Sequence, residues 1–331
     1  MSELRLNLLT REWVIIASER AKRPIDYKSS LTRPTPPEYL NTCPFCFGNE
    51  HKTPDEILRV AEDGKWRMRV VSNKYPALLN KGERKWWGDD GKRSVSGVGV
   101  HEIIIESPLH NSSMALADLK YIEDILGIYK NRFIEAHRDP RVEHVIIFKN
   151  HGEGAGTSIG HPHTQLIGTP VVPIQFRDRV QAAMHFFDDT GKCLVCSILE
   201  EEKSEGRRIL IDTEHFMTFI PYAALSPFHT WIFPKRHSAS FSDIMEEEIK
   251  DLATHLKTLL SKFYWGLDDP DYNYVIRSSR PEDAGNEYCH WYLAAIPRIT
   301  RSAGFELGSG MFINTSLPEE SADFLKTVRI E

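Results

Sequence analysis

The chain has no uninterrupted apolar run that approaches the roughly 18 residues of a membrane span. Its first residues lack the charged-then-apolar pattern of a secretory signal peptide. It also lacks a basic surplus, because 41 Lys and Arg stand against 47 Asp and Glu, for a formal charge of -6. We therefore expect a cytoplasmic protein that binds neither membranes nor nucleic acid, and whose anionic ligands need a local basic site.

Cysteine is scarce, with five residues in 331, yet four of them form two CxxC pairs. In a reducing compartment such pairs indicate metal or redox chemistry rather than structural disulfides. The composition gives no sign of disorder, since 41% of the residues are hydrophobic. A chain of this length forms one large domain or two of moderate size.

One helical pattern occurs twice. Apolar residues from Leu119 to Phe133 fall at offsets 0, 3, 7, 10 and 14, and those from Ile249 to Phe263 repeat these offsets. Such spacing is typical of one face of an amphipathic helix. A strand-like segment that ends in histidine precedes each helix, and a β-branched segment follows it, at 142–148 and 272–277. The repeated order predicts two related halves.

Weaker patterns predict the remaining elements. Residues 4–18, 67–71 and 99–106 are strand-like, and 176–187 are expected to form a short helix. The loop at 81–97 is rich in charge, glycine and tryptophan, so we expect it to be mobile. Trp86 and Trp87 are interpreted as surface packing residues, with a ligand or dimer surface as the alternative. His101 and His229 occupy equivalent repeat positions and are expected to pack within the sheet.

The cysteine pairs keep the register of the repeat. His110 precedes His161 by 51 residues, and His237 precedes His290 by 53. The near-equal spacings predict two tetrahedral zinc sites, each with a full set of protein ligands and therefore structural rather than catalytic. The alternatives are redox-active or buried thiols, and Cys289 in place of His290. The predicted ligands are Cys43, Cys46, His110 and His161 in one site, and Cys193, Cys196, His237 and His290 in the other.

Two histidines and a glutamine alternate directly after the glycine-rich loop at 154–160. If a strand begins at His161, then His161, His163 and Gln165 lie on one face. With His161 on zinc, His163 is the candidate nucleophile for an α-phosphorus. A neutral imidazole is required, and a hydrogen bond to its other nitrogen would fix the attacking tautomer. The alternative is a polar edge strand without chemistry.

Attack by His163 would give a covalent nucleotidyl-histidine and divide one transfer into two steps. Positioning and charge stabilisation carry most of such a reaction. The backbone amides of residues 154–160, the Ser158 hydroxyl and the Gln165 amide are candidate donors to the phosphate oxygens.

These motifs together resemble the galactose-1-phosphate uridylyltransferase family, a branch of the histidine-triad superfamily. The resemblance spans nearly the whole chain and implies an α+β fold of two histidine-triad-like half-repeats, each an antiparallel sheet with a packed helix. We place the halves at 1–190 and 191–331 and expect a homodimer whose active site draws on both subunits. The segments that carry the resemblance are 19–24, Cys43 to Cys46, 107–110, Asn150, Ser158 and 161–165.

Residue by residue, the resemblance makes His163 the nucleophile and Gln165 a catalytic partner. It places Asn150, Ser158 and Gln165 around the nucleotide phosphates, with Arg20, Arg23 and Asn73 completing the substrate contacts. Gln165 stands where histidine-triad hydrolases carry a third histidine, which favours transfer over hydrolysis. Tyr292 replaces the nucleophile in the second half, so only the first half is expected to be active. The resemblance also allows iron instead of zinc in the second metal site.

Two departures concern the substrate. Lys74 follows Asn73 where the uridylyltransferases carry an acidic residue, and residues 307–310 lack the tyrosine and glutamate usual near the hexose. The pattern is similar to the sister branch, the ADP-glucose phosphorylases. The predicted function is transfer of UMP, or another nucleoside monophosphate, between a nucleotide sugar and a hexose 1-phosphate. The alternatives are phosphate as acceptor, and a zinc-stabilised nucleotide-binding protein without turnover.

Overall fold

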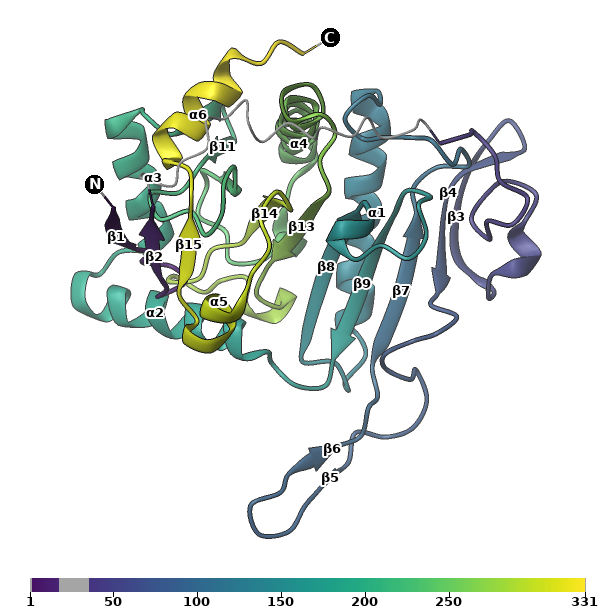
Figure 1. Cartoon of the computed structure of the whole chain (residues 1–331). Coiled ribbons are helices and arrows are strands. Elements are labelled where there is room, and N and C mark those ends of the chain that lie inside the picture. The colour runs from purple at the N-terminus through teal and green to yellow at the C-terminus, as the bar shows by residue number, and fades with distance from the viewer. Residues whose placement is uncertain (1, 18–35, 331) are drawn as a thin grey trace.

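The computed structural model of the chain describes residues 2–17 and 36–330. Its centre is a ten-stranded antiparallel sheet in the order β10-β11-β12-β14-β13-β8-β9-β7-β4-β3 (Figure 1). One half holds β3 (Glu56–Glu62), β4 (Lys65–Ser72), β7 (Val100–Ile105), β8 (His144–His151) and β9 (His163–Thr169). The other holds β10 (Ile209–Asp212), β11 (Phe216–Phe219), β12 (Thr230–Pro234), β13 (Tyr272–Arg277) and β14 (Tyr292–Pro297).

The two halves have the same strand order and join where β8 pairs with β13. In each half a helix connects the third strand to the fourth, namely α1 (Leu119–His137) and α4 (Glu246–Leu267). The expected α+β fold, with two half-repeats that each combine an antiparallel sheet and a packed helix, is confirmed.

The main core lies between the sheet and the helices α1 and α4, which pack against each other. Leu126, Phe133, Leu256 and Phe263 are almost completely buried in it, at the positions that the helical spacing predicts. Burial of each such side chain contributes roughly 1.5–3 kcal/mol. This face of the sheet is therefore fully occupied, and ligands have to approach from the other side.

The opposite face differs between the halves. In the second half α2 (Ile174–Thr190) and α3 (Leu194–Glu205) cover it, and α3 packs on an aromatic cluster of Phe219, Trp231, Phe233 and Tyr292. In the first half the segment around Phe45 packs on Ile103 and Ile105 instead. Cross-strand partners share a face of a sheet, so His163, opposite Ile105, and Gln165, opposite Ile103, lie on this second face.

Residues 4–18 were expected to form one strand, and this is wrong. Two short strands, β1 (Glu3–Leu6) and β2 (Trp13–Ile16), form a hairpin instead. The Asn7 side chain accepts hydrogen bonds from the amides of Leu9 and Thr10, which bends the chain, and Arg11 adopts a left-handed φ of 62°. On its other side β2 pairs in parallel with β15 (Phe312–Asn314).

The charged loop at 81–97 contains a second hairpin, β5 (Trp86–Trp87) with β6 (Ser94–Val95), which extends away from the sheet (Figure 1). Both tryptophans are exposed, at 61% and 58%, so the expectation of surface packing is wrong for them.

The remaining helices are short. α5 (Gly304–Ser309) and α6 (Pro318–Thr327) follow the second half, and the turns η3 (Glu50–Lys52), η4 (Glu153–Ala155), η5 (Phe241–Asp243) and η6 (Pro281–Asp283) lie in connections. Within the described parts of the chain, no helix combines the length and apolar character needed to cross a membrane.

Candidate metal centres and active site

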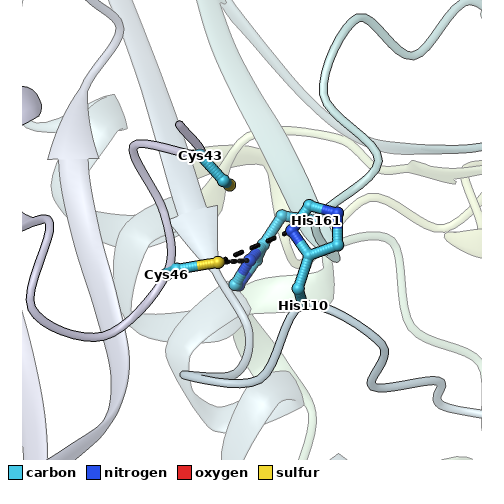
Figure 2. A group of neighbouring side chains, drawn as sticks. All are labelled: Cys43, Cys46, His110 and His161. Carbon is cyan, nitrogen blue, oxygen red and sulfur yellow. Dashed lines mark hydrogen bonds between the residues drawn. The ribbon is translucent and has the colours of Figure 1, made fainter. Parts of the chain in front are cut away.

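The structure brings the first predicted ligand set together. Cys43 and Cys46 lie in the segment before β3, His110 lies after β7, and His161 lies just before β9 (Figure 2). The Cys46 Sγ is 3.6 Å from the Nδ1 atoms of both His110 and His161. One ligand atom from each of the four residues lies within 4.8 Å of the others, and all four residues are buried. Two thiols and two imidazoles at these separations fit one tetrahedral ion.

The surroundings prepare these side chains to bind a cation. The His161 Nε2–H donates to the Ser107 carbonyl at 2.7 Å, which turns the Nδ1 lone pair toward Cys46. Burial lowers the pKa of His161 to about 4, so its imidazole is neutral, as a metal ligand requires. Burial also raises the pKa of the Cys43 thiol, and a bound dication would favour the thiolate.

The second ligand set is also together, in a less buried position. The Cys196 Sγ lies 3.5 Å from His237 Nδ1 and 3.7 Å from His290 Nδ1. The two Nε2–H groups donate to backbone carbonyls, from His237 to Asn286 at 3.0 Å and from His290 to Pro234 at 2.9 Å. The set consists of Cys193, Cys196, His237 and His290, and Cys289 is not part of it.

His163 stands apart from the first ligand set. The strand begins at His163 and not at His161, so the expected alternation along one strand applies only to His163 and Gln165. The His163 Nδ1–H donates to the His161 carbonyl at 2.8 Å, which leaves the Nε2 lone pair as the available nucleophile. Burial lowers the pKa of His163. The Phe45 ring packs edge-on against the imidazole, with 5.4 Å between the ring centroids. The ring is therefore neutral, oriented and not a member of the metal cluster.

Gln165 is held by a residue that was expected only to pack in the sheet. The Ala77 amide donates to His101 Nδ1 at 3.0 Å, so the His101 Nε2 carries the proton. That Nε2–H donates to Gln165 Oε1 at 2.9 Å, and the Asn73 side chain lies 3.0 Å from the same nitrogen. With its oxygen engaged, the Gln165 amide has its N–H groups available for a substrate.

His101 lies within the sheet, as expected, and belongs to neither metal-ligand set, but it also holds Gln165. His229 of the second half is buried and accepts from Trp231 Nε1 at 3.1 Å. The local sequence could not distinguish the roles of His101 and His229, because these roles depend on the residues that each histidine meets on neighbouring strands.

The glycine-rich loop offers fewer free amides than expected. The Gly154 amide donates to the Asp271 carboxylate, and those of Gly156 and Thr157 donate to carbonyls within the loop. The expectation that the amides of residues 154–160 cradle phosphate is therefore wrong for residues 154–157. Only the amides of 158–160 remain as candidate phosphate donors. Of the other predicted substrate contacts, Ser158 is exposed, and the Asn150 Oδ1 accepts a hydrogen bond from Asn273 Nδ2 at 2.8 Å. Arg20 and Arg23 lie outside the described residues.

A buried ion pair that the sequence analysis missed lies under the nucleophile's strand. Lys149 Nζ donates to Glu106 Oε2 at 2.5 Å, and it also lies 3.4 Å from the His163 carbonyl. Both side chains are almost fully buried. The other Glu106 oxygen accepts from Thr164 Oγ1 at 2.7 Å and from Tyr129 at 3.3 Å. A lysine directly after the apolar run 145–148 was the one available signal.

Comparison with known proteins agrees with this fold. Residues 1–173 match the family described as galactose-1-phosphate uridyl transferase, N-terminal domain, and 179–303 match its C-terminal domain. An ADP-glucose phosphorylase of Arabidopsis thaliana is 36% identical over 99% of this chain and 93% of its own length. A galactose-1-phosphate uridylyltransferase of Thermotoga maritima is 29% identical, with full coverage of both chains.

A solved structure is similar over its whole length. It is an ADP-glucose phosphorylase from Arabidopsis thaliana with bound ADP-glucose, with a TM-score of 0.84, 33% identity and 100% coverage of both chains. Fold and site thus define a two-repeat protein with a buried, oriented histidine beside a Cys/Cys/His/His cluster. The chain belongs to the galactose-1-phosphate uridyl transferase family, near its ADP-glucose phosphorylase branch, as the motifs predicted.

Proposed function

We propose that this protein is a nucleotidyltransferase that acts through His163. It moves UMP, or another nucleoside monophosphate, between a nucleotide sugar and a hexose 1-phosphate. The observation that carries the proposal is the hydrogen bond from His163 Nδ1–H to the His161 carbonyl, which leaves Nε2 free while His161 belongs to the metal cluster. The relatives named as uridylyltransferase and phosphorylase support the same class of reaction.

In the first step His163 Nε2 attacks the α-phosphorus of the nucleotide sugar, and the bond from that phosphorus to the bridging oxygen breaks. The leaving group is a sugar 1-phosphate, a stable anion that needs no proton from the enzyme. In the second step an oxygen of the acceptor phosphate attacks the phosphorus and the P–N bond breaks, which restores the neutral imidazole. The proton stays on Nδ1 in both steps, where the His161 carbonyl holds it.

Gln165 and neighbouring side chains supply hydrogen-bond donors for the phosphoryl group. Since His101 occupies the Gln165 oxygen, the amide N–H groups can bond a phosphoryl oxygen whose charge changes during transfer. Asn73 lies beside His101, and Asn150 and Ser158 border the glycine-rich loop; we propose these three, with Arg20 and Arg23, as substrate contacts. A glutamine provides hydrogen bonds without the proton transfer that hydrolysis would need.

The two Cys/Cys/His/His clusters are proposed as zinc sites, with iron as the alternative in the second. Two thiolates and two imidazoles form the donor set that zinc prefers in closed structural sites. When bound, the first ion would fix the His161 backbone, and with it the carbonyl that orients His163. The second would hold β14 to the start of α3 through His290 and the cysteine pair.

The acceptor has two candidates. A hexose 1-phosphate corresponds to the uridylyltransferase relatives, and inorganic phosphate corresponds to the ADP-glucose phosphorylase. Relatives of both kinds match nearly the whole chain, at 36% and 29% identity, so the identities support both acceptors. Lys74 in place of an acidic residue adds positive charge near Asn73, which suits a small anionic acceptor. We propose a cytoplasmic homodimer in either case, with a boundary between halves near residue 190.

The test is intact-protein mass spectrometry after incubation with UDP-glucose or with ADP-glucose. The donor that adds a nucleotidyl mass identifies the base. Glucose 1-phosphate, galactose 1-phosphate or phosphate is then added, and the compound that removes the mass is the acceptor. Labelling that His163→Ala abolishes supports the enzyme. Tight nucleotide binding without any adduct from either donor would instead support a binding protein without turnover.

A further inference from the structure

A hollow lies in the half that has no nucleophile. It has about 400 Å³ of empty volume, including space open to solvent, between α2 and the strands β13 and β14. Its polar lining residues include Arg179, Arg277, Ser279 and Tyr292, and apolar side chains such as Phe176 and Val180 make up much of the remainder. Among the residues that the structure describes, no acidic side chain lines it.

The repeat symmetry relates this hollow to the catalytic face. In the first half Lys149 pairs with Thr164, so the next positions of that ladder set Asn150 opposite His163. In the second half the equivalent ladder pairs Arg277 with Tyr292. Arg277 therefore occupies the position of Asn150, a proposed contact of the nucleotide phosphates, and Tyr292 occupies that of His163. The second half has lost the nucleophile but has gained a cation.

The two arginines in the hollow have few partners for their positive charges. The Arg179 Nε–H donates to the Tyr292 hydroxyl at 3.2 Å, and its Nη1 donates to the Gln175 carbonyl. The Arg277 guanidinium makes no hydrogen bond or ion pair with any residue in the described parts of the chain. Burial lowers the pKa of Arg277, and the like charge of Arg179 acts in the same direction.

The negative charge of the Glu12 carboxylate raises the pKa of Arg277 and so opposes the effect of burial. Glu12 forms no ion pair with a described residue, and its Oε2 is buried without a hydrogen-bond partner. Two guanidinium groups and a single unpaired carboxylate leave a net positive site. A partly buried guanidinium without a partner favours an anion beside it, and its planar set of donors matches the oxygens of a phosphate.

We propose that this hollow binds a phosphate group, either inorganic phosphate or the phosphate of a small monoester. Arg277 and Arg179 donate to its oxygens, and the apolar walls accept the uncharged part of an ester. The site is separate from the one around His163 and does not depend on the transfer reaction. Its occupant would pair with the Arg277 guanidinium and tie α2 to the strands β13 and β14.

The first test locates the anion directly. Crystals are soaked in selenate, a tetrahedral dianion whose selenium is located by anomalous diffraction. A peak within hydrogen-bond distance of the Arg277 and Arg179 guanidinium groups supports the proposal. A peak near His163 alone, or an adventitious ion only at surface lysines, overturns it.

The second test measures binding in solution. Calorimetric titration with inorganic phosphate, and separately with glucose 1-phosphate, is compared for the wild type, Arg277→Met and Arg179→Met. The matched control is Arg177→Met, an exposed arginine two residues away on α2. We expect one binding event to weaken at least tenfold, about 1.4 kcal/mol, in both hollow variants and not in the control. Equal binding in all four proteins would refute the site, and the two ligands decide between free phosphate and an ester.

Thermal unfolding keeps the test decisive if a variant folds poorly. Phosphate should raise the Tm of the wild type and of Arg177→Met, because a ligand that binds only the folded state stabilises it. The increment should shrink in Arg277→Met and in Arg179→Met. In phosphate-free buffer Arg277→Met should be no less stable than the wild type, since it removes a partly buried cation that has no partner among the described residues. An unchanged phosphate increment in both variants would contradict the proposal.

Discussion

Replacement of Lys149 by Met removes the cation from the buried pair under the nucleophile's strand. The Lys149 and Glu106 side chains are 4% and 1% exposed, and their closest atoms are 2.5 Å apart. Removal of one partner from such a pair costs about 3–5 kcal/mol, because the other charge stays buried. In Lys149→Met the Glu106 carboxylate keeps its bonds from Thr164 and Tyr129, so we expect a loss near 3 kcal/mol.

Glu106→Gln is expected to cost more, about 4–5 kcal/mol, because the Lys149 ammonium would stay buried without a counter-charge, beside neutral oxygens only. The double variant Lys149→Met, Glu106→Gln leaves no buried charge and should lose only about 1–2 kcal/mol. The structure therefore predicts a coupling free energy of about 5–7 kcal/mol between the two positions.

Urea unfolding of the wild type, both single variants and the double variant measures this coupling. The control is Lys120→Met, which removes a lysine whose side chain is 73% exposed and whose ion pairs lie at the surface, and which should leave the stability unchanged. Additive losses in the double variant would refute the inference that the two charges compensate each other beneath His163.

Three further changes have defined outcomes. Cys46→Ser should remove one metal ion per chain, measured by elemental mass spectrometry, and lower the Tm; an unchanged metal content would exclude Cys46 as a ligand. His101→Phe frees the Gln165 amide to rotate, so kcat should fall about tenfold with KM little changed, and His101→Asn should recover part of it; an equal fall for both variants would contradict this positioning role. Arg59 and Arg69 lower the pKa of Glu56 to about 2, so its contribution is present above pH 4.5 and is lost as the pH falls toward 2. Glu56→Gln should thus lower the Tm at pH 7 and matter less near pH 3; an equal effect at both values would count against the ion pair.

The sequence predicted those parts of the molecule that local spacing determines. The helices α1 and α4 follow from apolar offsets, since one face of each is buried in the core. The two ligand sets could be predicted because cysteine pairs and histidines at matching spacings are typical metal ligands. Gln165 and His163 lie on the same face of β9 because alternate residues of a strand do so.

Features that depend on the pairing of distant strands could not be predicted in this way. His101 and Gln165 are 64 residues apart, and their contact depends on the register between β7 and β9. Glu106 and Lys149 meet because β7 and β8 flank β9. The Gly154 amide is committed to Asp271, 117 residues away, so a glycine-rich sequence alone overstated the free donors.

The central claim is that His161 holds a metal while His163, two residues later, is free to bond phosphorus. Native mass spectrometry after incubation with the nucleotide-sugar donor reads metal content and nucleotidyl adduct in one spectrum. We predict that His163→Ala keeps the wild-type metal content and gains no adduct, whereas His161→Ala loses one metal ion. An adduct on His163→Ala, or loss of its metal with metal retained in His161→Ala, would contradict this division of roles.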